Sequence, residues 1–459
     1  MKKYIGDRAF YKRLFAVMIP ILIQNVITNF VSLLDNIMVG QVGTEPMSGV
    51  AIVNRLLFVY NLAIFGGLAG ASIYTAQFYG KGDDEGVRNT VRFKWFVALG
   101  IFAAGLTVLL TMGDTLIGLF IHDGGEALDL AATSAYAKDY LLVMLFQLFP
   151  FAVSNIYAST LRETGETVLP MKAGIAAVMV NMVFNYILIF GKLGAPKLGV
   201  VGAAIATVLS RFVECGILVI WTHRHKERNR FVRGLYSTFR VPGTLAKQIA
   251  VMGFPLLINE VLWSSGMTTL DQCYSMRGLE VISALNISTT VSNLFFCAFF
   301  SMGNTISIMV GQILGSGDTE RAVDEDRKLI AFAVALCTVV GLFMVVLAPL
   351  IPGIYKTTDG VKALAATLLT ICAVMMPVNA FTNGCYFTLR SGGKTWITFA
   401  FDSLFVWVVA VPAAVFISRR TAMAIVPMYI VIQALDLIKC VVGYILVKSR
   451  KWVNNLVKE

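Results

Sequence analysis

Long apolar stretches separated by short polar segments run along the whole chain. A helix that spans a membrane needs about 20 mainly apolar residues, because lipid cannot satisfy exposed backbone groups and a helix satisfies them internally. The pattern predicts an all-α integral membrane protein with twelve transmembrane helices. The weakest boundary separates the seventh and eighth helices, where only Arg277 and Glu280 supply charge. We place the helices at residues 14–38, 50–79, 93–112, 134–157, 168–190, 198–221, 247–276, 281–312, 329–351, 363–388, 395–417 and 424–447.

The first apolar run lies close to the start of the chain, where a signal peptide would also lie. The chain begins Met1-Lys2-Lys3, but no small-residue cleavage site follows the run. We therefore expect a retained helix and not a cleaved signal. We expect no soluble domain before or after the helices.

The chain contains an internal repeat of long period. Residues 74–83 return as residues 309–318, with Gln, Gly, Gly and Asp at matching positions 235 residues apart. A second match, at an offset of 228, relates Leu161 and the residues after it to Leu389 and its successors. The repeat indicates that the chain arose by duplication of one structural unit.

The repeat predicts two homologous six-helix lobes, residues 1–221 and 247–459, joined by a basic linker at 222–246. Pro20 and Pro255 support this division, because each lies early in the first helix of its half at the same offset of 235. Six is an even number of spans, so both halves enter the membrane in one orientation and are related by an axis along its normal. Such duplication is typical of carriers, although channels also show it.

Composition agrees with a membrane protein. Hydrophobic residues make up 57% of the 459 positions and charged residues 14%, whereas soluble domains carry about 25% charged residues. The net charge of +11 does not indicate nucleic-acid binding, because the 38 lysines and arginines concentrate in alternate loops, as the positive-inside rule predicts. Both termini and the linker are then cytoplasmic, and the run from His223 to Arg230 is expected to contact anionic lipid head groups.

Cysteine and histidine usage argues against a metal centre or a bound cofactor. The seven cysteines lie in predicted helices without a Cys-x-x-Cys pair, and they are expected to be packing residues. The three histidines, His122, His223 and His225, all fall in predicted loops. Zinc and haem sites therefore lack ligands, and we expect no cofactor.

Acidic residues at membrane depth are functional candidates, because burying a charge in lipid costs several kcal/mol. Glu260 lies about 20 Å along its helix from Lys247, and Asp402 about 12 Å from Lys394. Asp35 closes the first helix, where an exposed interfacial carboxylate is an equally good interpretation. A low-dielectric cavity favours the neutral carboxyl form, so such a group can take up and release a proton. With neutral oxygen donors it can instead bind a sodium ion.

Polar neighbours in the fifth and sixth helices form a second candidate group. Asn181 and Asn185 stand four residues apart and share a helix face, from which they could hydrogen-bond a carboxylate or simply join two helices. Thr207 ends a run of small residues that permits close helix packing. The remaining charges are expected to neutralise each other along one helix, as Arg211 with Glu214 and Asp436 with Lys439.

These elements, in their order and spacing, resemble the multidrug and toxic compound extrusion (MATE) family, in particular its bacterial NorM-like and DinF-like branches. The resemblance covers essentially the whole chain and implies a V-shaped pair of six-helix lobes. It rests on the helix from Pro20 to Asp35-x-x-Met38-x-Gly40, on Gln77-x-x-Gly80-x-Gly82-Asp83, on Leu161-Arg162-x-x-Gly165-x-Thr167, and on Asn181 and Asn185 followed by Gly199-x-x-Gly202-Ala203-Ala204-x-Ala206-Thr207.

The resemblance also implies a site and a function. Family members export organic cations or other amphipathic compounds in exchange for inward-moving protons or sodium ions. A bend of the first helix at its proline, here Pro20, is implicated in coupling, and proline does remove an intrahelical hydrogen bond. The coupling-ion site of the N-lobe corresponds here to Asp35, Asn181, Asn185 and Thr207, with Na⁺ at Asp35 as one option.

Two positions depart from the family pattern. DinF-like members tend to have aspartate where this chain has Asn185, which leaves one acid in the N-lobe and counts against a purely proton-driven scheme. The family's seventh-helix glutamate usually follows its proline by more than the five residues that separate Pro255 from Glu260. Glu260 is therefore expected about one turn from the family position.

The leading hypothesis is an H⁺- or Na⁺-coupled antiporter that exports organic cations or amphipathic drugs by alternating access. Asp35 would bind the coupling ion, while Glu260 and Asp402 would line the C-lobe cavity and meet substrate or a second ion. We expect a multi-pass monomer in the plasma or inner membrane, in contact with small molecules and lipid and not with nucleic acid.

Other functions fit the pattern less well. A flippase for a lipid-linked precursor would favour a cationic cavity for pyrophosphate, whereas the deep charges here are mostly acidic. An exporter of one specific metabolite and a channel are further alternatives. A membrane-embedded enzyme would need a nucleophile with a base at depth, and no histidine lies in a predicted span. The sequence does not choose between H⁺ and Na⁺ or name the substrate.

Overall fold

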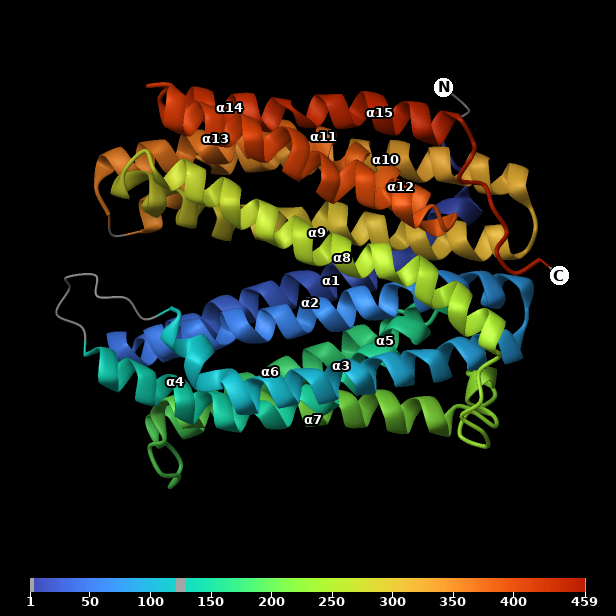
Figure 1. Ribbon diagram of the computed structural model, residues 1–459, viewed down its shortest axis with the longest axis horizontal. Helices are drawn as coiled ribbons and strands as arrows, with labels where there is room; N and C mark the ends of the chain where they lie inside the picture. The colour runs from blue at the N-terminus through green and yellow to red at the C-terminus, as the bar shows by residue number, and fades with distance from the viewer. Residues whose placement is uncertain (1–3, 121–128, 356, 459) are drawn as a thin grey trace. The chain divides into compact units, whose positions relative to one another are not determined.

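The computed structural model describes residues 4–120, 129–355 and 357–458, and the regular structure in these ranges is helical. Twelve helical segments within them are long and apolar enough to cross a membrane. The predicted all-α class and number of spans are therefore confirmed. Nine spans are single helices (Figure 1): α1 Arg8–Gly40, α2 Thr44–Lys81, α3 Asp84–Gly118, α6 Val168–Phe190, α7 Gly199–Arg224, α8 Gly243–Ser275, α9 Leu279–Gly315, α10 Thr319–Leu347 and α11 Asp359–Ser391.

The other three spans are broken helices. The fourth consists of α4 Leu130–Met144 and α5 Leu148–Glu163, separated by a 3₁₀ turn at Leu145–Gln147. The eleventh runs from α12 Thr395–Phe399 through π-helical turns at Ala400–Leu404 and Val406–Ala410 to α13 Val411–Arg420, and the twelfth consists of α14 Ile425–Ala434 and α15 Asp436–Lys448. Pro150 and Pro412 lie at the starts of α5 and α13, where a missing backbone N–H disturbs the preceding turn.

The weak boundary between the seventh and eighth predicted helices is real. α8 ends at Ser275 and α9 begins at Leu279, with Gly278 between them at φ +127°, a backbone conformation that residues with a β-carbon rarely adopt. Arg277 fixes the turn, because its Nη2 donates to the carbonyls of Ile417 and Thr421 at 2.8 and 2.9 Å.

The helices pack into two compact units. The first comprises Met1–Leu22, Ala76–Asp83 and Ala250–Glu459, and the second comprises Ile23–Thr75 and Asp84–Ile249. The helices α1 and α2 each contribute residues to both units. This division is based on packing contacts, whereas the predicted division at 221 and 247 is based on the sequence repeat. The division into repeat halves therefore stays a prediction.

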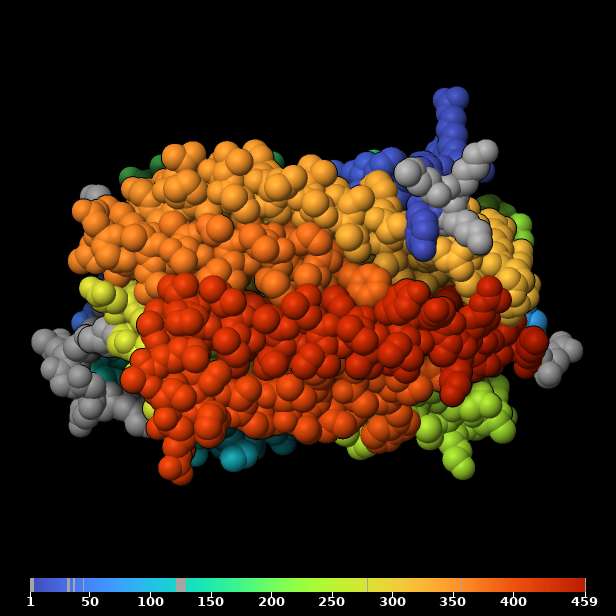
Figure 2. Space-filling model, turned by 90° about the horizontal axis from the view of Figure 1, so that it is seen from above, coloured from blue at the N-terminus to red at the C-terminus, as the bar shows by residue number. Residues whose placement is uncertain are grey.

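The first unit is built around α9, α10 and α11, which lie side by side (Figure 1). Its core includes the fully buried Leu368, Leu369 and Met428. Its outer face is apolar, as a surface in contact with lipid requires. The helices α14 and α15 form the red band in Figure 2, and α15 exposes Leu437, Ile438, Val441, Val442, Tyr444 and Ile445.

The repeated Gln-x-x-Gly segments contact each other inside the first unit. A β-carbon at Gly80 would collide with the backbone of Gln312, and one at Gly315 would collide with the backbone of Gln77. The two glycines are therefore needed at one symmetric helix crossing. The Gln77 side chain adds a contact to the chain end, since its Oε1 accepts from Leu456 N at 2.7 Å.

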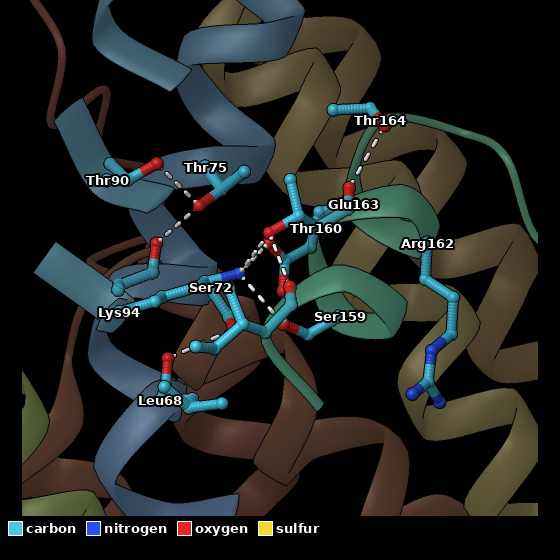
Figure 3. A network of polar contacts seen from close by, with 12 residues as sticks. Leu68, Ser72, Thr75, Thr90, Lys94, Ser159, Thr160, Arg162, Glu163 and Thr164 are labelled. Atoms are coloured by element: carbon cyan, nitrogen blue, oxygen red, sulfur yellow. Dashed lines mark hydrogen bonds and ion pairs between the residues drawn. The ribbon is translucent and has the colours of Figure 1, made fainter. Parts of the chain in front are cut away.

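The second unit contains a buried ion pair that joins α3 to α5 (Figure 3). Lys94 is fully buried, and its Nζ donates to Glu163 Oε2 at 2.6 Å, Ser159 Oγ at 3.0 Å and Thr160 Oγ1 at 3.2 Å. An ammonium has three protons to donate, so this one is fully satisfied. The geometry indicates a structural role for Lys94.

The basic segment 222–246 folds back onto the second unit. Arg92 of α3 donates to the carbonyls of Leu235 at 3.0 Å and Gly234 at 2.8 Å, and Arg228 pairs with Glu166 at 2.5 Å. The prediction that His223 lies in a loop is wrong, because α7 continues to Arg224.

Candidate functional site

The four predicted residues of the coupling site come from three helices of the second unit. Asp35 lies in the last turns of α1, Asn181 and Asn185 lie on α6, and Thr207 lies on α7. The amides are buried, with exposed fractions of 5% and 1%, because they point from α6 toward the neighbouring helices and not toward lipid. The close packing of α6 on α7 follows from Gly202, where a β-carbon would collide with the backbone of Leu188.

Hydrogen bonds connect these four residues into one network. Asn185 Nδ2 donates to Asp35 Oδ1 at 2.6 Å and to Asn181 Oδ1 at 3.1 Å. Asn181 Nδ2 donates to Thr207 Oγ1 at 3.2 Å, and Thr207 Oγ1 donates a hydrogen bond to the carbonyl of Ala203 at 3.0 Å. The structure therefore brings together all four residues, while their function stays a prediction.

The amide of Asn181 fits this network in either of two orientations. With its oxygen and nitrogen exchanged, its nitrogen donates to Asp35 Oδ1 at 2.8 Å and Oδ2 at 3.2 Å, and its oxygen accepts from Thr207 Oγ1 at 3.2 Å. An ionised Asp35 favours this second orientation, because two oxygens at such a distance repel unless a proton lies between them. A protonated Asp35 can instead donate to the Asn181 oxygen. The amide orientation is therefore sensitive to the charge on Asp35.

The network is rich in oxygen atoms and carries one acid. Asn185 Oδ1 is buried and has no hydrogen-bond partner, and Asp35 forms no ion pair within the described ranges. Carboxylate, amide and hydroxyl oxygens are ligands for hard cations. Within the part of the chain that the structure describes, no cluster of three or more His, Cys, Asp or Glu side chains could hold a metal ion. The chemistry of the site thus suits a proton or a single alkali cation.

Sequence reasoning missed other residues near Asp35. Tyr140 of α4 interacts electrostatically with Asp35 and donates to Asn54 Oδ1 of α2 at 3.5 Å. Arg211 of α7 also acts electrostatically on Asp35, and it pairs with Glu214 at 2.9 Å as expected. No spacing along the chain relates Tyr140 to Asp35, so only the fold reveals this neighbour.

Pro20 lies inside α1, which continues through it without a break. It belongs to the first unit, and the change of unit along α1 falls two residues later, between Leu22 and Ile23. Proline lacks the N–H that would bond the carbonyl one turn earlier, so α1 is weakest near this point. A hinge at Pro20 stays a prediction.

A second polar cluster lies in the first unit around Asp402. Lys439 Nζ donates to Asp402 Oδ1 at 3.0 Å, and Asn259 Nδ2 donates to Oδ2 at 3.2 Å. The expectation that Lys439 pairs with Asp436 on its own helix is wrong. The ammonium group of Lys439 forms its ion pair with the carboxylate of Asp402, which lies on another helix. Ser403 ties the cluster together by donating to Asn259 Oδ1 at 2.7 Å.

Glu260 belongs to the same neighbourhood. It follows Asn259 on α8 and interacts electrostatically with Arg390 and Asp402, but it has no ion pair among the residues that the structure describes. The structure thus brings Glu260 and Asp402 close together, and of the two only Asp402 is in an ion pair within the described residues. The π-helical turn at Ala400–Leu404 carries Asp402, and such turns are frequent at functional sites.

Comparisons with known proteins agree on one family. A family model described as MatE matches residues 20–187 and 255–416, two segments that begin 235 residues apart, as the repeat does. The chain is 25% identical over 454 residues to a protein of Thermotoga maritima described as a probable multidrug resistance protein NorM, with coverage of 97% of this chain and 94% of that protein. It is 24% identical over 413 residues to the multidrug resistance protein MdtK of Pectobacterium atrosepticum, with coverage of 90% and 88%.

Solved structures show the same fold. A multidrug resistance MATE family transporter of the MOP superfamily, in an outward-facing conformation, matches with a TM-score of 0.83 at 20% identity over 98% of both chains. A MATE transporter of Vibrio cholerae matches with a TM-score of 0.84 at 17% identity, over 96% of this chain and 97% of the other. The family match covers more than half of the chain. The chain therefore belongs to the MatE family and is a multi-pass membrane transporter, not an enzyme.

Proposed function

We propose that the protein exports organic cations or other amphipathic small molecules in exchange for H⁺ or Na⁺, with Asp35 as the residue that binds the coupling ion. The observation that carries this proposal is the environment of Asp35. The carboxyl group is held by the neutral amide of Asn185, with the orientable amide of Asn181 beside it, and has no ion pair in the described ranges. Relatives described as multidrug resistance proteins support the substrate class.

The network around Asp35 supplies a response to ion binding. When Asp35 is ionised, both amides can donate to it. When a proton neutralises Asp35, the Asn181 oxygen can turn toward it, and the Asn181 nitrogen is then available to Thr207 Oγ1. A sodium ion would draw the amide oxygens toward itself in the same way, because it needs oxygen ligands. A change in the charge of Asp35 on α1 thereby changes the hydrogen bonding of Thr207 on α7.

Glu260 completes the proposal in the first unit. A cationic substrate needs an acid that is not already neutralised, and Glu260 meets this condition better than Asp402, which Lys439 holds at 3.0 Å. Glu260 would therefore attract the substrate cation, while Asp402 keeps Lys439 and Asn259 in place. We propose that the protein is a monomer in the plasma or inner membrane. The concentration of basic residues in alternate loops supports cytoplasmic termini.

Transport in proteoliposomes tests the proposal. A fluorescent organic cation is supplied, and a proton gradient or a sodium gradient is imposed separately. Movement of the cation against its own gradient under one of them is the expected result. Asp35→Asn should abolish this driven movement, whereas the matched control Asp271→Asn, which removes an exposed acid from α8, should keep it. Gradient-driven movement by Asp35→Asn at the rate of the unaltered protein would overturn the proposal.

A further inference from the structure

We propose that a cavity at the start of α1 and α10 binds a phospholipid whose headgroup carries a phosphate and a primary ammonium group. The cavity has a volume of about 830 Å³, within the range of about 300–1,000 Å³ that is usual for small-molecule sites. Its charged lining consists of Asp7, Arg13, Arg321, Asp324, Glu325 and Lys328. All of these residues belong to the first unit, whereas the network around Asp35 belongs to the second. This lipid site is therefore separate from the proposed coupling site.

Two arginines of the lining share one acid. Arg13 Nη2 donates to Glu325 Oε1 at 2.6 Å, and Arg321 Nε donates to the same oxygen at 2.8 Å. One carboxylate neutralises only one of two guanidinium groups, so one positive charge is left over. Arg13 Nε is buried without an acceptor, and the terminal nitrogens of Arg321 have no acceptor in the described ranges. Guanidinium groups with unused N–H donors are well suited to bind a phosphate.

Asp7 supplies a negative charge to the same cavity. It caps the N-terminus of α1, since its Oδ1 accepts from Phe10 N at 2.7 Å. Its carboxylate forms no ion pair within the part of the chain that the structure describes. Asp324 and Lys328 neutralise each other, because Lys328 Nζ donates to Asp324 Oδ2 at 2.6 Å. The cavity thus combines one surplus positive charge with one surplus negative charge, as a headgroup with a phosphate and an ammonium requires.

The position of the cavity indicates that its occupant is a lipid. The charged lining lies at the first turns of two membrane spans, since α1 begins at Arg8 and α10 at Thr319. Phospholipid headgroups lie at the ends of spanning helices. Next to the charged lining, Tyr11, Phe15 and Phe332 form an aromatic cluster with ring centres 5.6–6.2 Å apart. Aromatic side chains such as tyrosine are enriched at the interface between membrane and water.

The outer face of α10 continues from this cluster as an apolar surface. Val339 follows Phe332 by seven residues, which is two helical turns, so both lie on one side of α10. Val339, Leu342, Phe343 and Val346 are each exposed by 59–66%. Part of the surface of α10 is visible in gold in Figure 2. The acyl chains of a lipid held in the cavity can lie along this surface, whereas a water-soluble phosphate ester would leave it uncovered.

Lipid binding to the full-length protein in detergent tests this proposal. Phosphatidylethanolamine, phosphatidylcholine and phosphatidylglycerol with identical acyl chains are titrated separately, and bound lipid is counted by native mass spectrometry. We expect phosphatidylethanolamine to half-saturate the site at a concentration about threefold lower than the other two, because neither of them has an ammonium N–H to donate to Asp7. Glycerophosphoethanolamine, which has the headgroup but no acyl chains, should bind at least about tenfold more weakly.

Two conservative substitutions test the two charges separately. Arg321→Gln should weaken the binding of phosphatidylethanolamine by about tenfold, because a charged contact with the phosphate is lost while Glu325 keeps its other arginine. Asp7→Asn keeps an oxygen acceptor for Phe10 N and should abolish the preference for phosphatidylethanolamine over phosphatidylcholine. Arg419→Gln, which removes an exposed cation at the end of α13 outside the cavity, should bind all three lipids as the unaltered protein does.

Several outcomes would overturn the proposal. They are equal half-saturating concentrations for the three lipids, an unchanged affinity in Arg321→Gln and an unchanged lipid preference in Asp7→Asn. Tighter binding of phosphatidylglycerol would show that positive charge alone selects the ligand. Glycerophosphoethanolamine binding as tight as that of the lipid would indicate a site for a soluble phosphate ester. Melting temperatures without added lipid show whether each variant is folded, and if Arg321→Gln is not, Asp7→Asn and the lipid series decide.

Discussion

Each of the two units holds an acid within a polar cluster, but the partners of the two acids differ. In the second unit Asp35 is bonded by a neutral amide, and the nearby Arg211 is tied to Glu214. In the first unit Lys439 binds Asp402 directly at 3.0 Å. The cations come from the last span of each half and lie 228 positions apart, the same offset that relates Leu161 to Leu389.

From this difference we expect the two units to perform different tasks. An acid that is paired inside the protein is a fixed structural element, because breaking a buried ion pair leaves an uncompensated charge. An acid surrounded by neutral oxygens and amides can exchange its counter-ion at lower cost. We therefore expect Asp35 to be the exchangeable site and the pair of Asp402 with Lys439 to be the permanent one.

The largest expected effect comes from removing the permanent counter-ion. Lys439→Met should leave Asp402 charged and unpaired and lower the stability by about 3 kcal/mol, measured as a fall in the melting temperature in detergent. Arg211→Met, at the corresponding position of the other half, should cost less than about 1 kcal/mol, because Glu214 keeps Arg162 nearby. Adding Asp402→Asn to Lys439→Met should restore most of the loss. Equal melting temperatures for the two single variants would show that the two cations contribute equally to stability and would contradict this prediction.

The next effect concerns the amide that holds the permanent pair. Asn259→Ala removes bonds to Asp402, Tyr386 and Ser403 and should lower the stability by about 2 kcal/mol, because buried polar groups lose their partners. Asn379→Ala, at a partly buried position of α11, serves as a control in the same melting experiment. A melting temperature for Asn259→Ala no lower than for the control would contradict the assigned role.

A third change makes the exchangeable site more acidic. Asn185→Asp places a second carboxyl group 2.6 Å from Asp35, and two carboxylates so close together share a cation strongly. We expect sodium or proton binding to tighten by about tenfold, measured as the half-saturating concentration. The corresponding change in the first unit, Asn259→Asp, should leave that concentration within about twofold, because Lys439 already neutralises Asp402. Similar shifts from both variants would show that the two acids are not distinct in function.

The smallest effect is expected at the far end of the Asp35 network. Thr207→Ala removes the hydroxyl that contacts Asn181 at 3.2 Å, so the amide loses one partner but Asp35 keeps its bond to Asn185. We expect ion binding to weaken by about threefold, since hydrogen bonds between helices in membranes contribute about 0.6 kcal/mol. Thr207→Ser, which keeps the hydroxyl, should bind as the unaltered protein does. Weakening by Thr207→Ser equal to that by Thr207→Ala would show that the hydroxyl is not the cause.

Much of the fold follows from the sequence, because a long apolar segment in a bilayer must form a helix to satisfy its backbone hydrogen bonds. The twelve spans could be predicted from hydropathy, and the break at Gly278 from two charges. The 3₁₀ and π-helical interruptions could not be predicted from the sequence, because the extent to which a proline distorts a helix depends on the packing around it. The docking of segment 222–246 also depends on carbonyls that only the folded chain brings to Arg92.

The candidate site could be predicted in part for a related reason. Asn181 and Asn185 share a face because of helix geometry alone, and the family resemblance linked them to Asp35 and Thr207. The partner of Lys439 was predicted wrongly. Spacing along the helix pointed to Asp436, three residues away, but the fold brings Asp402 of another helix within ion-pair distance. Local spacing decides which residues share a face, but tertiary packing decides which of them meet.

The membership of the first unit has a consequence for how the chain is made. Phe10 and Leu14 of α1 pack with Met302 and Ile306 of α9 and with Trp452 near the end of the chain. At a synthesis rate of about 5–20 residues per second, the start of α1 enters the membrane roughly 15–60 s before α9 exists. During that interval its apolar face has only lipid to contact. The earliest segment to be inserted is therefore among the last to reach its final packing, and the second unit can assemble first.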